Sequence, residues 1–190
     1  ISDTAGNSGP AAYTSGTTHT VAIPTAPDAP TIGAATAGDG QASVAFTAPA
    51  NNGGSAITGY TVTSNPGGIT AGGNGFTTSP ITVTSLTNGT AYTFTVTATN
   101  SVGTSTTSGA SNSVTPKGDQ TITLANPGAQ NFGTAPTLSA AATSGLTVTF
   151  TSSTTGVCTI TSGGLLTFVT AGSCTINADQ AGNTAWNAAP

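Results

Sequence analysis

The chain has 190 residues, a formal net charge of −4 and only 3% charged residues, far below the quarter or so that is typical. One lysine and no arginine cannot neutralise several phosphates, which excludes nucleic-acid binding and a basic membrane-binding face. No apolar run is long enough to span a membrane, and no signal-peptide pattern opens the sequence. We therefore expect a mature or internal piece of a longer protein.

Residues 1–23 are too short to form a domain, because an isolated hairpin is only marginally stable in water. They end in an alternating segment that predicts a β-strand. The predicted strand consists of His19, Thr20, Val21, Ala22 and Ile23. We interpret 1–23 as the closing hairpin, or a donated strand, of a preceding or neighbouring Ig-like module. The proline-rich stretch 24–30 then predicts a short, stiff linker.

Residues 24–117 carry the clearest strand pattern. Apolar and polar residues alternate through much of 81–103, so that one face of each strand meets a core and a threonine-covered face meets water. Glycine- and asparagine-rich turns separate the alternating runs, and such a series predicts a Greek-key β-sandwich. The expected strands are 31–36, 41–47, 57–64, 75–78, 81–85, 91–100 and 110–115.

The residues around Tyr92 resemble the fibronectin type III domain. The resemblance rests on Leu86, Tyr92, Phe94, Val96, Ala98, Asn100 and Gly103. It implies that Tyr92 forms the tyrosine corner of the family and that Leu86 belongs to the core. Phe46 replaces the tryptophan usual on the second strand. The Arg-Gly-Asp motif of integrin-binding members is absent, so integrin recognition is not implied.

Residues 118–190 form a second predicted module. Its expected strands are 120–124, 136–142, 146–152, 157–161, 165–169 and 173–179. The segments 144–150, 157–160, 171–176 and 180–183 resemble Ig-like repeats of large bacterial surface and secreted proteins. That family would continue into one more alternating strand after Pro190, so we expect a module that lacks its last strand.

Cys158 and Cys174 are the only cysteines, and their spacing matches no metal-binding motif. Such a pair indicates one disulfide and an oxidising compartment; two buried free thiols are the alternative. The resemblance to the bacterial repeats implies that the two residues pair.

A short repeat connects the two ends of the sequence. The pattern D-x-A-G-N-[S/T] begins at Asp3 and again at Asp179, an offset of 179 − 3 = 176 residues. The strand that the second module lacks therefore has a candidate in residues 19–23. The chain is then a slice of a tandem array, or residues 1–23 of one copy complete the last module of another.

No residue cluster predicts catalysis, a cofactor or a bound metal. His19 is the only histidine, the serines lack a nucleophile motif, and the five aspartates are scattered. Calcium needs six to eight oxygen ligands, and no dense acidic loop supplies them. Trp186 is interpreted as a structural core residue, with a sugar-stacking platform as the alternative.

The sequence thus predicts an all-β chain of tandem Ig-like and fibronectin type III sandwiches, preceded by a hairpin or donor strand. We expect a non-enzymatic, extracellular or cell-surface structural protein, part of a bacterial filament or adhesin rod. Its expected partners are copies of itself or adjacent repeats, joined head-to-tail. The alternative is a spacer or carbohydrate-binding accessory module of a secreted enzyme, which would contact a surface glycan. An adhesin tip with a receptor site in its loops is a third interpretation.

Overall fold

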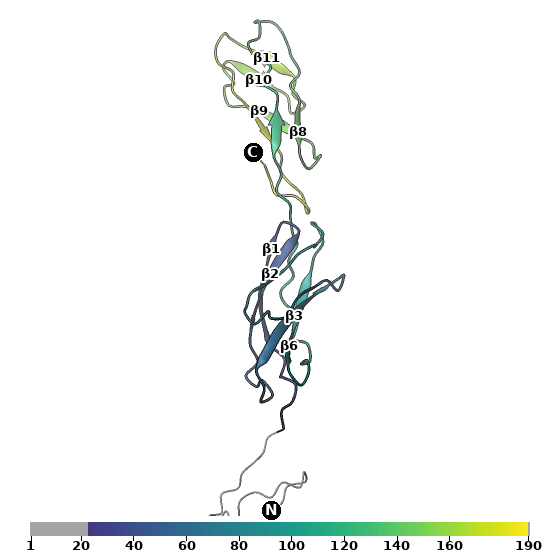
Figure 1. Ribbon diagram of the computed structural model, residues 1–190. Helices are drawn as coiled ribbons and strands as arrows, with labels where there is room; N and C mark the ends of the chain where they lie inside the picture. The colour runs from purple at the N-terminus through teal and green to yellow at the C-terminus, as the bar shows by residue number, and fades with distance from the viewer. Residues whose placement is uncertain (1–22, 190) are drawn as a thin grey trace, which may run out of the picture.

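The computed structural model describes residues 23–189 as two β-rich modules placed end to end (Figure 1). The predicted strand residues His19, Thr20, Val21 and Ala22 lie outside this described part of the chain. The described residues form strands, turns and no helix, which confirms the expected all-β fold. It follows that no helix in this part of the chain could cross a membrane.

The first module is a sandwich of two three-stranded antiparallel sheets, with orders β1–β2–β5 and β4–β3–β6. The strands are β1 (Thr31–Gly38), β2 (Gln41–Thr47), β3 (Ile57–Asn65), β4 (Thr70–Asn74), β5 (Ile81–Val83) and β6 (Thr93–Asn100). The period-two alternation explains the core, because the apolar residues of each strand turn inward and the threonines turn outward. Among the inward side chains, Val44, Val62, Val83, Phe94 and Val96 are fully buried.

The fourth strand lies earlier than predicted, at Thr70–Asn74 instead of 75–78. It pairs with β3 directly after the turn, with Thr70 opposite Thr63 and Gly72 opposite Thr61. Glycine is depleted in strands, so the sequence Ala-Gly-Gly gives little strand signal. Gly72 is nonetheless required, because its φ is +95° and a Cβ atom there would collide with the carbonyl oxygen of Tyr60.

The strand predicted over 110–115 does not form as a regular strand. Instead, three serines at a spacing of three line the outer edge of β6. Ser105, Ser108 and Ser111 each donate their backbone N–H to a β6 carbonyl, over 2.8–2.9 Å. Their hydroxyl oxygens accept the N–H groups of Ala98, Val96 and Phe94, over 2.9–3.0 Å. Because serine hydroxyls replace backbone carbonyls as acceptors, the backbone N–H groups along this edge of β6 are hydrogen-bonded without a continuous ladder.

The second module has shorter strands, paired two by two. They are β7 (Ile122–Leu124), β8 (Ala140–Ala142), β9 (Thr149–Ser152), β10 (Cys158–Ile160), β11 (Leu166–Phe168) and β12 (Ile176–Asp179). The antiparallel pairs are β7–β8, β10–β11 and β9–β12. A bridge between Thr137 and Leu165 joins the first two pairs into one layer, and β9–β12 forms the other. Each strand falls within a predicted one, but is shorter.

Candidate functional site

The junction between the modules is the first candidate site. The N–H of Gly118 donates to the carbonyl of Ala185 over 2.9 Å, and the N–H of Asn187 donates to the carbonyl of Gly118 over 2.8 Å. These bonds hold the link segment against the last residues of the second module. The Asn187 side-chain amide also donates to the carboxylate of Asp119, over 2.8 Å. The segment that leaves the first module is therefore fixed as soon as it enters the second.

Trp186 covers this link. A Cβ atom built on Gly118 would lie 2.8 Å from Cζ3 of the Trp186 ring and 3.0 Å from the side-chain nitrogen of Asn88. Since Asn88 belongs to the first module, Gly118 lies between side chains of both. The Trp186 side chain is half-buried at the junction, not in the core of the second module, so the core interpretation is wrong. Trp186 keeps a structural role. Gly118 covers part of the ring surface on which a sugar would have to stack.

The first module presents a turn, residues 87–90, to this junction. The carbonyl oxygen of the Asn88 side chain accepts the N–H of Gly40 over 2.9 Å, and its amide donates to Asp39 over 2.8 Å. A Cβ atom on Gly89 would lie 3.0 Å from Cβ of Ala185, so the turn packs closely on the second module. Asn88-Gly89-Thr90 also has the formal pattern of an N-glycosylation site, and the Asn88 side chain is engaged here in two structural hydrogen bonds.

The core residues predicted for the first module are found inside it. The hydroxyl of Tyr92 accepts the backbone N–H of Thr87 over 3.1 Å, which is the geometry of a tyrosine corner. Leu86 is 6% exposed and belongs to the same hydrophobic cluster. Phe46 packs against Tyr60 with ring centroids 4.7 Å apart. Burial raises the pKa of Tyr60, an effect of core packing that needs no catalytic explanation.

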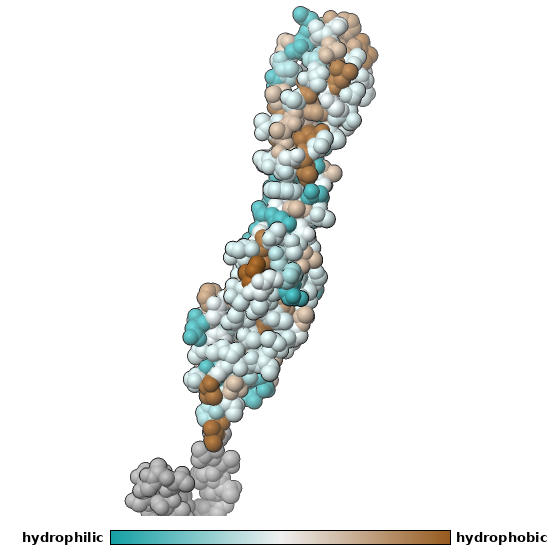
Figure 2. Space-filling model, turned by 90° about the vertical axis from the view of Figure 1, so that its right-hand side faces the viewer, coloured by the Kyte–Doolittle hydropathy of each residue, from teal (hydrophilic) through white to brown (hydrophobic). Residues whose placement is uncertain are grey.

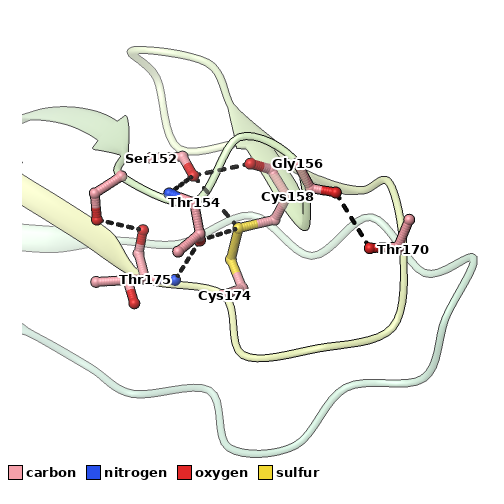
Figure 3. Close-up of a disulfide and its surroundings, with 8 residues drawn as sticks. Ser152, Thr154, Gly156, Cys158, Thr170, Cys174 and Thr175 are labelled. Atoms are coloured by element: carbon pink, nitrogen blue, oxygen red, sulfur yellow. Dashed lines mark hydrogen bonds between the residues drawn. A yellow bond between two sulfur atoms is a disulfide. The ribbon is translucent and has the colours of Figure 1, made fainter.

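A disulfide joins Cys158 to Cys174 (Figure 3). Cys158 begins β10 and is fully buried, whereas Cys174 precedes β12, so the bond connects the two layers of the second module. The hydroxyl of Ser152 donates to the Cys158 carbonyl over 2.8 Å. The Thr154 hydroxyl accepts the N–H of Thr175 over 2.8 Å. These bonds tie both sides of the disulfide to the segment that follows β9.

An open groove of about 620 Å³ runs along the second module. Its lining includes the apolar side chains of Leu138, Leu166 and Ile176. Residues 125–130 and Phe132, which follow β7, and residues 170–172, 174 and 175, which precede β12, also line it. No residue that lines it is charged. Apolar surface recurs along this module in Figure 2, and the sequence analysis did not predict the groove.

Neither a metal cluster nor an aromatic platform forms in the described part of the chain. No three histidine, cysteine or acidic residues meet within residues 23–189. The exposed aromatic side chains are Phe76, which is 54% exposed on the first module, and Phe132, which is 69% exposed on the second. A sugar-stacking surface usually needs several aromatic rings side by side, and these two lie on different modules.

Comparison with known families gives a match in the first module. Residues 26–114 match the fibronectin type III domain. The first module is thus similar to fibronectin type III domains. Such a domain is generally a non-catalytic module. Comparison with curated proteins finds no match.

Solved structures with similar modules include multidomain fragments. A fragment of titin is 29% identical over 48% of this chain and 33% of its own, with a TM-score of 0.43. The FN1–FN3 domains of chicken CNTN1 are 23% identical over 50% of this chain and 34% of theirs, with the same TM-score. The twitchin kinase region from C. elegans is 25% identical over 47% of this chain and 17% of its own, with a TM-score of 0.41. The match thus spans about a third or less of each of these solved chains.

Proposed function

We propose that the chain is a non-enzymatic segment of an extracellular rod, part of a bacterial surface filament or adhesin stalk. The observation that carries the proposal is the junction, where Trp186, Gly118 and Asn88 pack the two modules end to end. A flexible linker would let the modules bend freely, whereas a packed and hydrogen-bonded link keeps them in line. Fixed spacing along a line is what a rod or stalk requires.

The proposed location outside the cell is supported by the disulfide and by the fibronectin type III domain. Disulfides persist in oxidising compartments and are rare in the cytosol. The second module is, in this proposal, an Ig-like repeat of bacterial surface proteins. Its two β layers and the disulfide between them are consistent with that assignment. The partners in the rod are copies of the chain or adjacent repeats, arranged head-to-tail.

Trp186→Ala should make the two modules move independently while each stays folded. The ring covers Gly118, so its loss removes the side chain that packs the link, although the backbone bonds at the junction remain. Small-angle X-ray scattering should then show a broader distribution of interatomic distances and a shorter average length. The thermal unfolding of the first module should be unchanged.

Phe76→Ala is the matched control, because it also removes an aromatic ring, but one that is 54% exposed on the first module and belongs neither to the junction contacts nor to the groove lining. It should scatter like the wild type. The rod proposal fails if Trp186→Ala leaves the scattering unchanged, or if both variants change it equally.

A further inference from the structure

Strand β12 has a free edge. Among the described strands it pairs with β9 alone, with Ile176 opposite Ser152 and Ala178 opposite Phe150. The N–H of Ser153 donates to the carbonyl of Thr175, so Thr175 directs its backbone groups toward β9. Because backbone groups alternate in direction along an antiparallel strand, those of Ile176 and Ala178 point to the opposite edge. That edge can accept another strand.

The direction of such a strand is already set. Gln180 and Ala189 exchange two backbone hydrogen bonds of 2.8 Å each, in an antiparallel bridge. A strand in the same register would continue from this bridge along Ala178 and Ile176 toward Cys174. It would lie over the groove, whose lining includes Ile176, Cys174 and Gly172. The groove and the free edge therefore form a single acceptor site.

We propose that residues 17–23 of a second copy of this chain fill this acceptor site as an added β-strand. This inference rests on the proposed rod function and names the partner within it. The repeat at Asp3 and Asp179 gives an offset of 176 positions between donor and acceptor module. Ile176 lies four residues before Gln180. In an antiparallel pair it therefore faces the position four residues after Ala189, which would be number 189 + 4 = 193. Subtracting the offset, 193 − 176 = 17, places Thr17 there.

The same register decides which donor side chains enter the groove. Ile176 and Ala178 are half-buried and alternate with the exposed Asn177, so they face the inside of the module. Directly opposed residues of an antiparallel pair point to the same face. Donor residues in step with Thr17 therefore turn inward, and these are His19, Val21 and Ile23. Thr18, Thr20 and Ala22 turn toward water. The two large apolar side chains of the strand, Val21 and Ile23, thus meet an uncharged groove whose lining includes Leu138, Leu166 and Ile176.

The donor must come from another copy. The N–H of Thr25 donates to the carbonyl of Gly53 over 2.8 Å, and Asn100 donates to the carbonyl of Thr25 over 2.7 Å. Only Pro24 separates this anchor from Ile23, whose side chain is 84% exposed. The anchor lies at the end of the first module farther from the second, so the whole first module separates the donor from its own groove (Figure 1). The contact is therefore head-to-tail.

Sedimentation velocity of the full chain and two single variants tests this proposal. The wild type should form oligomers in multiples of 18.0 kDa as its concentration rises. Val21→Asp should weaken association by about 100-fold or more, because it buries an unpaired charge in the groove. Thr20→Asp adds the same charge to the outer face of the same strand and should assemble like the wild type. Amide exchange at Ile176, which faces Thr17 in this register, should slow only in the samples that assemble.

A wild type that stays monomeric at every concentration overturns the proposal, and so does equal assembly of Val21→Asp and Thr20→Asp. Oligomers in which the Ile176 amide exchanges as fast as in the monomer overturn it as well, since association then uses another surface. Equal thermal unfolding of the three proteins establishes that the substitutions act on association and not on folding. If the monomer still scatters as a straight two-module rod, only the strand-addition proposal fails and the rod function stands.

Discussion

Replacing both Cys158 and Cys174 by alanine should destabilise the second module by about 3 kcal/mol, the value that the chain-entropy model gives for a closed loop of this length. The expected effect is large relative to the stability of the module. Its buried apolar residues are few, and its strands are three or four residues long. The disulfide is also a covalent side-chain link between the two layers, so its loss leaves them joined by the chain, by packing and by hydrogen bonds such as the one from Ser152 to Cys158.

Urea unfolding followed by Trp186 fluorescence measures this effect, because the only tryptophan of the chain belongs to the second module. Reduced wild-type protein should unfold at the same low urea concentration as the double variant. The first module, which contains no cysteine, should keep its own transition in both samples. A variant with the midpoint of the oxidised wild type would contradict the stabilising role of the bond.

Leu86→Ala should destabilise the first module by about 2–5 kcal/mol, the usual cost of a large-to-small change in a packed core. Leu86 is 6% exposed and its N–H donates to the carbonyl of Gly40 over 2.9 Å, so the backbone holds the site in place. If the cavity left by the substitution cannot collapse, the folded state loses both the transfer free energy of the removed atoms and their packing contacts.

Calorimetry should show this loss as a fall of about 8 °C or more in the melting temperature of the first module, on the scaling for domains of this size. Val102→Ala is the matched control, because Val102 is an apolar residue of the same module that is 52% exposed. It should change the stability by less than about 0.5 kcal/mol. Equal effects of the two substitutions would show that Leu86 does not belong to the core.

The first module could be predicted from its sequence because local and long-range signals agree there. The alternation around Phe94 and Val96 determines which face is buried, and the pattern through Tyr92 resembles the fibronectin type III domain that residues 26–114 match. The two strand predictions that were wrong in this module, 75–78 and 110–115, failed for physical reasons. Gly72 and Gly73 weaken the strand signal of β4, although the absence of a side chain at Gly72 is what allows β4 to approach β3. Serine hydroxyls replace a backbone ladder along β6, and strand propensity cannot represent that substitution.

The second module and the junction were less predictable. The disulfide followed from two cysteines and a family resemblance. The position of Trp186 did not follow from the sequence. Its packing depends on Gly118 and Asn88, which are distant from it in the sequence and come together only where the two modules meet. The groove could not be predicted either. Its lining comes from segments far apart in the sequence, which follow β7, include part of β11 and precede β12.

The distance between spin labels on the two modules is the most direct test of the rod. Thr82, on β5, and Thr167, on β11, are exposed positions in strands of the first and second module. Both native cysteines are paired, so labels attached to Thr82→Cys and Thr167→Cys would react selectively. Pulsed electron paramagnetic resonance should give one narrow distance distribution centred on the separation set by the packed junction. A broad distribution in the wild-type background would mean that the modules move independently, and it would contradict the rod.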